Sequence, residues 1–126
     1  ENNSVSDATV SITITPIADL SVSDASVIEG NAGTTNLVFT LTVDAYEDVA
    51  SIDYAISDNT ATVNSDYVKG AGTGTVTFRS SSVSETITVV INGDTTLEPD
   101  EILTLTLSNA SNLQLSTVTA TGTIID

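Results

Sequence analysis

The chain has 126 residues, enough for one domain with a core, and it carries 17 acidic residues, two basic residues and no histidine. Its formal net charge of −15 argues against binding to nucleic acid or to an anionic membrane, and it favours cations as partners. The absence of cysteine excludes disulfides and thiolate metal sites. Because 40% of the residues are hydrophobic and recur periodically, we expect a folded chain.

The first residues of the chain form a pattern that its last residues repeat. An alternating stretch, "TVSITIT", is followed by Pro16, and the end of the chain, "STVTATGTIID", has a similar Thr-rich alternation. We interpret residues 1–19 as the last strand of a preceding repeat plus a linker, and residues 20–126 as the domain. The alternative is that residues 1–19 add an edge strand to this domain.

Period two dominates the rest of the chain and predicts seven strands. After an irregular first strand in "LSVSDASVI", apolar residues alternate in "TNLVFTLTV", "ASIDYAIS", "GTVTF", "SETITVVI", "EILTLTLS" and "VTATGTII". The opposite faces are rich in Thr and Ser, which is typical of antiparallel strands with one solvated face. The predicted fold is an all-β, antiparallel sandwich, and the pattern alone leaves Ig-like and jelly-roll connectivity open.

The same alternation predicts the hydrophobic core. One face of each predicted strand carries the large apolar side chains, and these faces are expected to meet between the two sheets. The predicted core consists of Leu37, Phe39, Leu41, Ile52, Tyr54, Val76, Phe78, Ile87, Val89, Leu103, Leu105, Leu107 and Ile124.

Carboxylates are concentrated where the predicted strands end. Four of them lie between positions 94 and 101, in "DTTLEPDE", with no basic residue nearby in sequence. Glu29 follows the first predicted strand, Asp58 follows the third, and Asp126 ends the last. Alternate loops of a sandwich lie at the same end, so these segments are expected to converge. Calcium takes about six to eight oxygen ligands of this kind. We therefore predict a calcium site, with a solvated acidic loop as the alternative.

Four blocks of the sequence resemble successive blocks of the Calx-beta domain. They read "VIEGNAG", "ISDNTATVNSDYVKGAGTGTVTF", "ETITVVINGDTTLEPDEILTLTLSN" and "ATGTIID", and together they cover about residues 20–126. The Calx-beta domain occurs in sodium–calcium exchangers, integrin β4 and many large microbial surface proteins. The resemblance implies a seven-stranded Ig-like sandwich, in agreement with the strands predicted above.

The resemblance also implies a set of calcium ligands. In calcium-binding members, the ligands come from a Glu in the first loop, an Asp in "DGTA", an acidic run before "E-x-D-E" and a terminal Asp cluster. Asn92 and Gly93 stand here in place of acids, and the terminal cluster is reduced to one residue, so fewer or weaker sites are expected than in the exchanger. The ligands implied for this chain are Glu29, Asp58, Asp94, Glu98, Glu101 and Asp126, with a backbone carbonyl near Thr96.

Other polar residues are given structural roles. Asp66 in "NSDY" is expected to cap its own turn. Asp100 is expected to point outward, and Asp44 to be solvated at the opposite end of the sandwich. Lys69 is the only lysine and lies in the Gly-rich turn "VKGAGTG", where we expect neither burial nor an isopeptide bond.

The sequence predicts a protein that is not an enzyme. It contains no histidine, no cysteine, no Gly-rich phosphate loop and no Gly-x-Ser-x-Gly motif, and it has no Trp for an aromatic sugar cleft.

We interpret the chain as a calcium-binding structural repeat of a large extracellular or cell-surface protein, such as a bacterial adhesin or stalk. Neighbouring repeats are the expected partners, with a host or matrix ligand as a further candidate. Nucleic acid binding and membrane insertion are not expected. The alternatives are a calcium-sensing repeat or a plain protein-interaction repeat.

Overall fold

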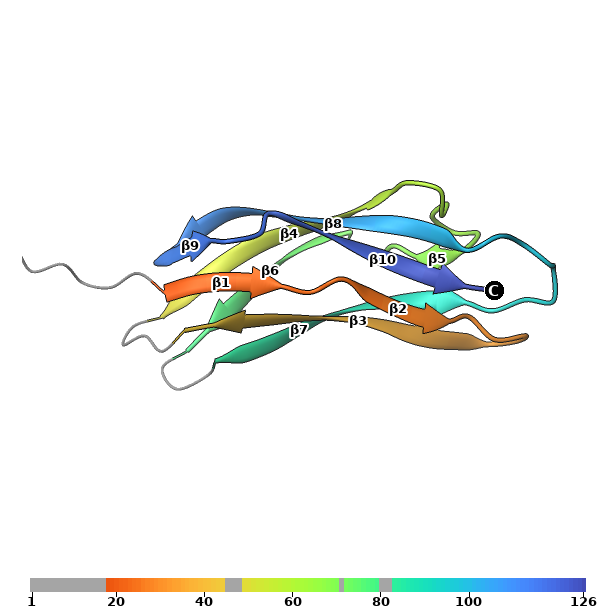
Figure 1. The fold of residues 1–126 in the computed structure, drawn as a ribbon, viewed down its shortest axis with the longest axis horizontal. Coiled ribbons are helices and arrows are strands. Elements are labelled where there is room, and N and C mark those ends of the chain that lie inside the picture. Colours follow the sequence, from red (N-terminus) through yellow and green to blue (C-terminus); the bar gives the residue numbers. More distant parts are fainter. Residues whose placement is uncertain (1–17, 45–48, 71, 80–82) are drawn as a thin grey trace, which may run out of the picture.

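The computed structural model describes residues 18–44, 49–70, 72–79 and 83–126, which form a two-layered β-sandwich without helices (Figure 1). Each layer is a five-stranded sheet. No helix in these ranges is long and apolar enough to cross a membrane. The strands are β1 (Ala18–Val22), β2 (Ala25–Ile28), β3 (Thr34–Val43), β4 (Ala50–Asp58), β5 (Tyr67–Val68), β6 (Thr73–Phe78), β7 (Ser84–Asn92), β8 (Glu101–Ser111), β9 (Leu113–Leu115) and β10 (Thr119–Ile125).

The structure has ten strands where seven were predicted, and the first predicted strand accounts for one of the three additional strands. It divides after Val22 into β1 and β2, and these halves pair in different sheets, whose orders are β5-β7-β3-β1-β9 and β2-β10-β8-β4-β6. The two short strands β5 and β9 complete the count. The all-β antiparallel sandwich is confirmed, with two parallel exceptions, β1 with β9 and β2 with β10. Asp24 lies where the chain passes from one sheet to the other. Its carboxylate holds this segment to β10, because it accepts a hydrogen bond from the Thr121 N–H at 2.8 Å.

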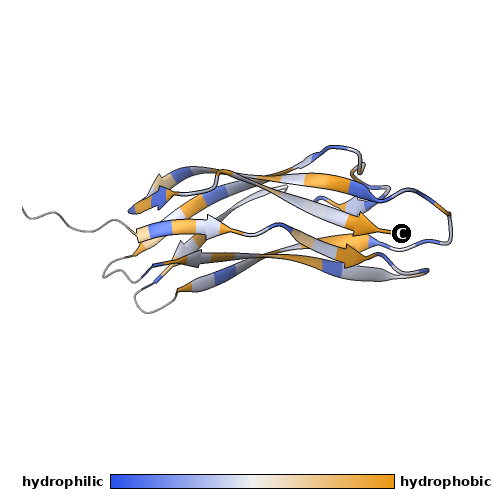
Figure 2. Ribbon diagram, viewed as in Figure 1, coloured by the Kyte–Doolittle hydropathy of each residue, from blue (hydrophilic) through white to orange (hydrophobic). Residues whose placement is uncertain are grey.

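Hydrophobic and hydrophilic residues alternate along the strands (Figure 2), and the apolar faces meet between the sheets as predicted. Every predicted core residue is buried except Tyr54, which is partly buried and packs against the core. Val118, which the pattern placed on the apolar face of the last strand, is 53% exposed because it precedes β10. Gly122 in β10 allows the sheets to approach, since a Cβ there would lie 2.5 Å from Leu37 Cδ2.

The predicted interpretation of residues 1–19 as part of a preceding repeat falls mostly outside the described residues and stays a prediction. The described part begins at Ala18, which is buried and already belongs to β1. The main-chain oxygen of the next residue, Asp19, accepts a hydrogen bond from the Asp44 N–H at 3.2 Å.

One end of the sandwich, called here the acidic end, gathers four segments that are distant in sequence: residues 29–33, 58–66 and 93–101, and Asp126 (Figure 1). Main-chain hydrogen bonds join them. The N–H of Glu29 donates to Ile125 O at 2.9 Å, and the N–H of Gly93 donates to Gly33 O at 2.9 Å. Sandwich topology therefore brings together the loops that the sequence predicted to converge.

Candidate metal site

Five carboxylates at the acidic end form two groups that share one member. Oxygens of Glu29, Asp94 and Glu98 lie within 4.8 Å of one another, and so do oxygens of Asp66, Glu98 and Glu101. Calcium–oxygen distances are about 2.3–2.6 Å, so oxygens around one ion lie within about 5 Å of each other. Each group therefore has the spacing of a calcium site, and Glu98 belongs to both.

Glu29 is the most buried member of the first group. It follows β2, its side chain is only 4% exposed, and its Oε1 atom has no hydrogen-bond partner among the described residues. Burial, which is the largest cause, acts together with hydrogen bonding to Asp126 and the charges of Asp94, Asp126 and Glu98 to raise the pKa of Glu29 to about 7. A buried carboxylate oxygen without a donor is unfavourable unless a cation pairs with it.

The second group has the same electrostatic character. Glu101 is the first residue of β8. Burial, the largest cause, acts together with hydrogen bonding to Asp66 and the charges of Asp66, Glu98 and Asp94 to raise its pKa to about 7. The pKa of Glu98 is also raised, by burial first and then by the charges of Asp94, Asp66 and Asp126. In both residues every contribution is an increase, so the surrounding protein disfavours their ionised forms.

The loop at residues 93–100 is shaped by its own carboxylates. Asp94 Oδ1 accepts the N–H of Thr96 at 2.7 Å, a local turn typical of aspartate. The N–H of Glu98 donates to Asp126 Oδ2 at 3.0 Å, and the N–H of Asp126 donates to Asp100 Oδ1 at 3.3 Å. Asp100 is exposed, as predicted, and also helps to fasten the loop to the end of β10.

Asp58 and Asp66 lie at the ends of the same loop and have different surroundings. Oδ1 of Asp58 accepts hydrogen bonds from the Tyr67 hydroxyl and from the Val63 N–H, the latter at 3.1 Å. Oδ2 of Asp66 accepts the Thr62 N–H at 2.7 Å, which confirms the predicted turn cap. Asp66 is also 7% exposed and belongs to the second carboxylate group, while Asp58 belongs to neither.

Comparison with known proteins identifies the family. The profile of the Calx-beta domain matches residues 12–126. The chain belongs to the Calx-beta family. A search of curated proteins finds no match. The resemblance seen in the sequence blocks is thereby confirmed, and Ca²⁺ is the cofactor that both the family and the two carboxylate groups support.

Solved structures share the fold of this Calx-beta domain. The apo-form Calx CBD1 domain is 24% identical, with a TM-score of 0.70, and the match covers 88% of this chain and 98% of that one. The CBD12 structure from CALX1.2 is also 24% identical, with a TM-score of 0.70, covering 86% of this chain and 44% of that one. The calcium binding domain CBD12 of CALX1.1 is 26% identical, with a TM-score of 0.67, covering 80% and 42%. This chain thus spans less than half of each CBD12 chain.

The acidic end of this Calx-beta domain contains all seven predicted ligand positions, and it brings four of them into the two groups: Glu29, Asp94, Glu98 and Glu101. Asp126 contacts two members, through the Glu98 N–H and the Glu29 side chain. Ligand roles for Asp58 and for a carbonyl near Thr96 stay predictions. Asp66 was not predicted as a ligand, although it lies in the same loop as Asp58. The rule that alternate loops share one end would have included it.

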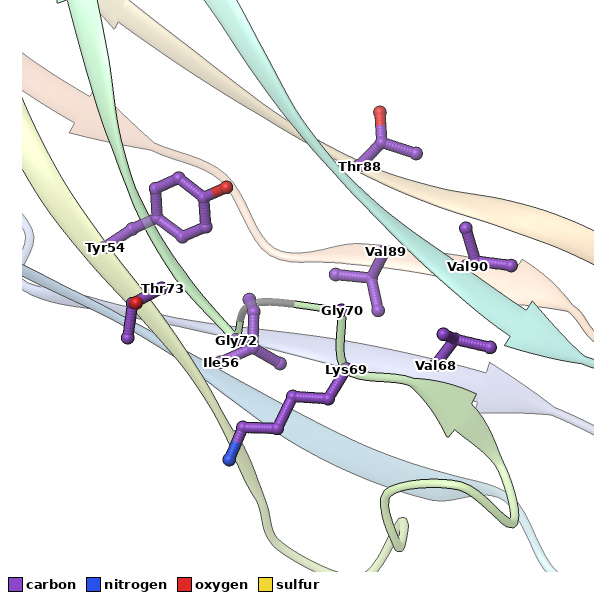
Figure 3. Close-up of a pocket in the computed structure, with 10 residues that line it drawn as sticks. All are labelled: Tyr54, Ile56, Val68, Lys69, Gly70, Gly72, Thr73, Thr88, Val89 and Val90. Atoms are coloured by element: carbon purple, nitrogen blue, oxygen red, sulfur yellow. The ribbon is translucent and has the colours of Figure 1, made fainter.

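A separate pocket of about 240 Å³ opens between β4, β6 and β7 and the turn after β5 (Figure 3). The stem of Lys69 lies over Gly72, where a Cβ would come 2.4 Å from Lys69 Cε. Ile56 and Val89 are buried residues of the lining, and the remaining lining side chains are hydroxyl-bearing or aliphatic. No carboxylate or amide side chain is among the lining residues, so this pocket offers neither a metal site nor an isopeptide partner for Lys69.

Proposed function

We propose that this Calx-beta domain is a non-catalytic structural module that binds calcium at its acidic end. The observation that carries the proposal is Oε1 of Glu29, a buried carboxylate oxygen without a hydrogen-bond donor, in a group with Asp94 and Glu98. The donors in both groups are carboxylate oxygens, which are hard ligands suited to Ca²⁺ and Mg²⁺. They come from the three segments 29–33, 58–66 and 93–101, an adaptable arrangement that favours Ca²⁺ over the tight octahedron of Mg²⁺.

Bound ions would cross-link the loops of the acidic end. One ion in each group would have Glu98 as a shared ligand and would connect residues 29–33, 58–66 and 93–101. Each ion would also replace mutual repulsion among carboxylates by attraction to a common cation. Binding to the folded state alone stabilises it by RT ln(1 + [L]/Kd), about 2.7 kcal/mol at a hundredfold excess over Kd.

The module is proposed to act within a row of repeats in an extracellular or cell-surface protein, such as an adhesin or stalk. Two observations support neighbouring repeats as partners. The matched CBD12 chains are more than twice the length covered by this chain, and the first and last segments of the sequence have similar alternating patterns. The strand β10 ends at the acidic end (Figure 1), so ions there would stiffen the joint with a repeat that follows it. A host or matrix ligand is proposed as a further partner.

Thermal melting of the chain tests calcium binding. Saturating calcium should raise Tm by about 10 °C over chelator, because about 2.7 kcal/mol corresponds to several degrees per kcal/mol in a domain of this size. Magnesium should produce a smaller rise, and sodium at equal ionic strength a smaller one still, because it only screens charge. Equal Tm values in calcium and chelator would reject the proposal.

A further inference from the structure

Asn92, the last residue of β7, and Gly93 connect the two carboxylate groups through three hydrogen bonds. The N–H of Asn92 donates to Asp66 O at 2.9 Å, and its side-chain Nδ2 donates to Ser65 O at 3.1 Å. The N–H of Gly93 donates to Gly33 O at 2.9 Å. This dipeptide therefore holds the loop of Asp66 on one side and the loop that follows Glu29 on the other.

The same dipeptide is chemically labile. In Asn–Gly, the glycine nitrogen can attack the asparagine side chain with little obstruction, because glycine has no Cβ and its backbone is permissive. We propose that Asn92 is a site of spontaneous deamidation, and that calcium at the acidic end controls its rate. The calcium dependence rests on the function proposed above, whereas the reactivity of Asn92 does not.

The reaction needs only water. Gly93 N loses its proton to solvent base and bonds to Asn92 Cγ, the bond from Cγ to Nδ2 breaks, and ammonia leaves with a proton from solvent. One water molecule then opens the resulting succinimide at either carbonyl, which gives aspartate or isoaspartate at position 92. The net change is the replacement of the side-chain NH₂ by OH.

The fold restrains both reacting groups. Asn92 lies in the extended backbone of β7, and its side-chain Nδ2 donates a hydrogen bond to Ser65 O. The attacking nitrogen of Gly93 donates a hydrogen bond to Gly33 O. Cyclisation requires the Gly93 nitrogen to turn toward Cγ, which breaks these bonds. The reaction should therefore proceed from a locally opened state of the acidic end.

Gly93 cannot be exchanged for a less reactive neighbour without disturbing the acidic end. A Cβ at this position would lie 2.9 Å from the carbonyl oxygens of Glu29 and Gly30 and 3.2 Å from Ala32 N. The packing of residues 29–33 thus requires the residue that makes Asn92 reactive.

Calcium should suppress this opening. An ion bound only to the closed loops lowers the opening constant by the factor 1 + [L]/Kd, so deamidation should slow about a hundredfold at a hundredfold excess over Kd. The product replaces an amide donor facing Ser65 O by a carboxylate and adds one negative charge beside Asp66. A domain that has lost calcium would then retain aspartate or isoaspartate at position 92, and its acidic end would be less stable.

The test follows the chain during incubation at mildly alkaline pH in calcium, in magnesium and in chelator. Cleavage after Glu85 and Glu101 releases residues 86–101, in which Asn92 is the only amide side chain, and residues 102–126 contain Asn109 and Asn112 as internal references. Mass spectrometry should find Asn92 deamidated first in chelator and protected in calcium. Reaction at Asn92 no faster than at the references in chelator would overturn the proposed site.

Two variants and one comparison separate this inference from the proposed function. Asn92→Gln should abolish the reaction in residues 86–101, because glutamine would have to form a larger ring, and Asn92→Asp should reproduce the lower Tm of the aged protein. If calcium raises Tm yet leaves the Asn92 rate unchanged, the calcium control is wrong while the proposed function stands. If calcium leaves Tm unchanged, the proposed function fails, and the chelator incubation alone decides the reactivity of Asn92.

Discussion

The main-chain N–H of Glu98 donates to Oδ2 of Asp126 at 3.0 Å, across 28 positions of the sequence. This hydrogen bond fastens the loop at residues 93–100 to the end of β10. It holds Glu98 where its carboxylate belongs to both groups, beside Glu29 and Asp94 on one side and Asp66 and Glu101 on the other. Both proposed ion positions therefore depend on the placement of this one residue.

Replacing Glu98 by glutamine should remove most of the calcium-dependent rise in Tm. The amide nearly preserves the size of the side chain while it removes the charge shared by both groups, so both sites should weaken together. In chelator the variant should melt no lower than the parent, because a repelling charge is gone.

The matched control for Glu98→Gln is Asp44→Asn. Asp44 is an exposed residue directly after β3, at the opposite end of the sandwich (Figure 1). This variant loses the same unit of charge and should keep the full response to calcium. A Glu98→Gln protein that responds like the parent would show that the shared carboxylate is not a ligand.

Glu29→Gln should separate two effects of the buried Glu29 carboxylate, which are the cost of its ionisation without calcium and its role as a ligand with calcium. In chelator at pH 8 the variant should melt above the parent, because it no longer ionises a group whose pKa burial raises to about 7. In calcium it should melt below the parent, because the cation loses a ligand. Asp44→Asn, at the opposite end of the sandwich, should change neither curve appreciably. A lower Tm for Glu29→Gln in chelator would contradict this assignment.

The calcium-free domain should lose stability as the pH rises between about 4.5 and 7. Glu29 and Glu101 have folded-state pKa values raised from 4.5 to about 7, so across this range the folded chain binds more protons than the unfolded chain. The free energy of unfolding then falls with increasing pH. Urea unfolding in chelator at several pH values measures this slope. Calcium competes with the same protons, so its affinity should fall as the pH drops below about 7.

The core prediction is tested by two leucines in contrasting positions. Leu105 in β8 is fully buried, whereas Leu97, in the loop of the acidic end, is 93% exposed. Leu105→Ala should lower the free energy of unfolding by about 2–5 kcal/mol. Leu97→Ala should change it by less than about 0.5 kcal/mol. Urea unfolding of both variants in chelator would contradict the assignment of faces if Leu105→Ala matched the effect of Leu97→Ala.

Much of the fold follows from alternation alone, because a half-buried strand must repeat its apolar residues at every second position. That rule located the core around Leu37, Phe39 and Leu105. It did not reveal that the chain changes sheet between Val22 and Ala25. Each half alternates by itself, and the only trace of the change is that the inward positions shift from even numbers in β1 to odd numbers in β2. It also could not detect β5, because two residues are too few to display a period.

The convergence of the acidic loops was predictable from topology, whereas the grouping of individual carboxylates was not. Sequence reasoning placed Glu29 and Asp58 at the same end, but it could not foresee that the Tyr67 hydroxyl engages Asp58. Asp66 had been assigned to its turn, and one of its oxygens does accept the Thr62 N–H. Its position beside Glu101 depends on the pairing of β5 with β7, which the alternation of apolar residues does not specify.

Calorimetric titration of the chain with calcium measures binding at the acidic end itself. We expect saturable binding, release of protons near pH 7 from Glu29 and Glu101, and weaker binding of magnesium under the same conditions. Glu98→Gln should bind far more weakly, and Asp44→Asn should bind as the parent does. The absence of saturable heat at calcium concentrations up to the millimolar range would show that the acidic end is not a calcium site, because calcium sites of extracellular modules bind with Kd values of about 10⁻⁴–10⁻³ M or tighter.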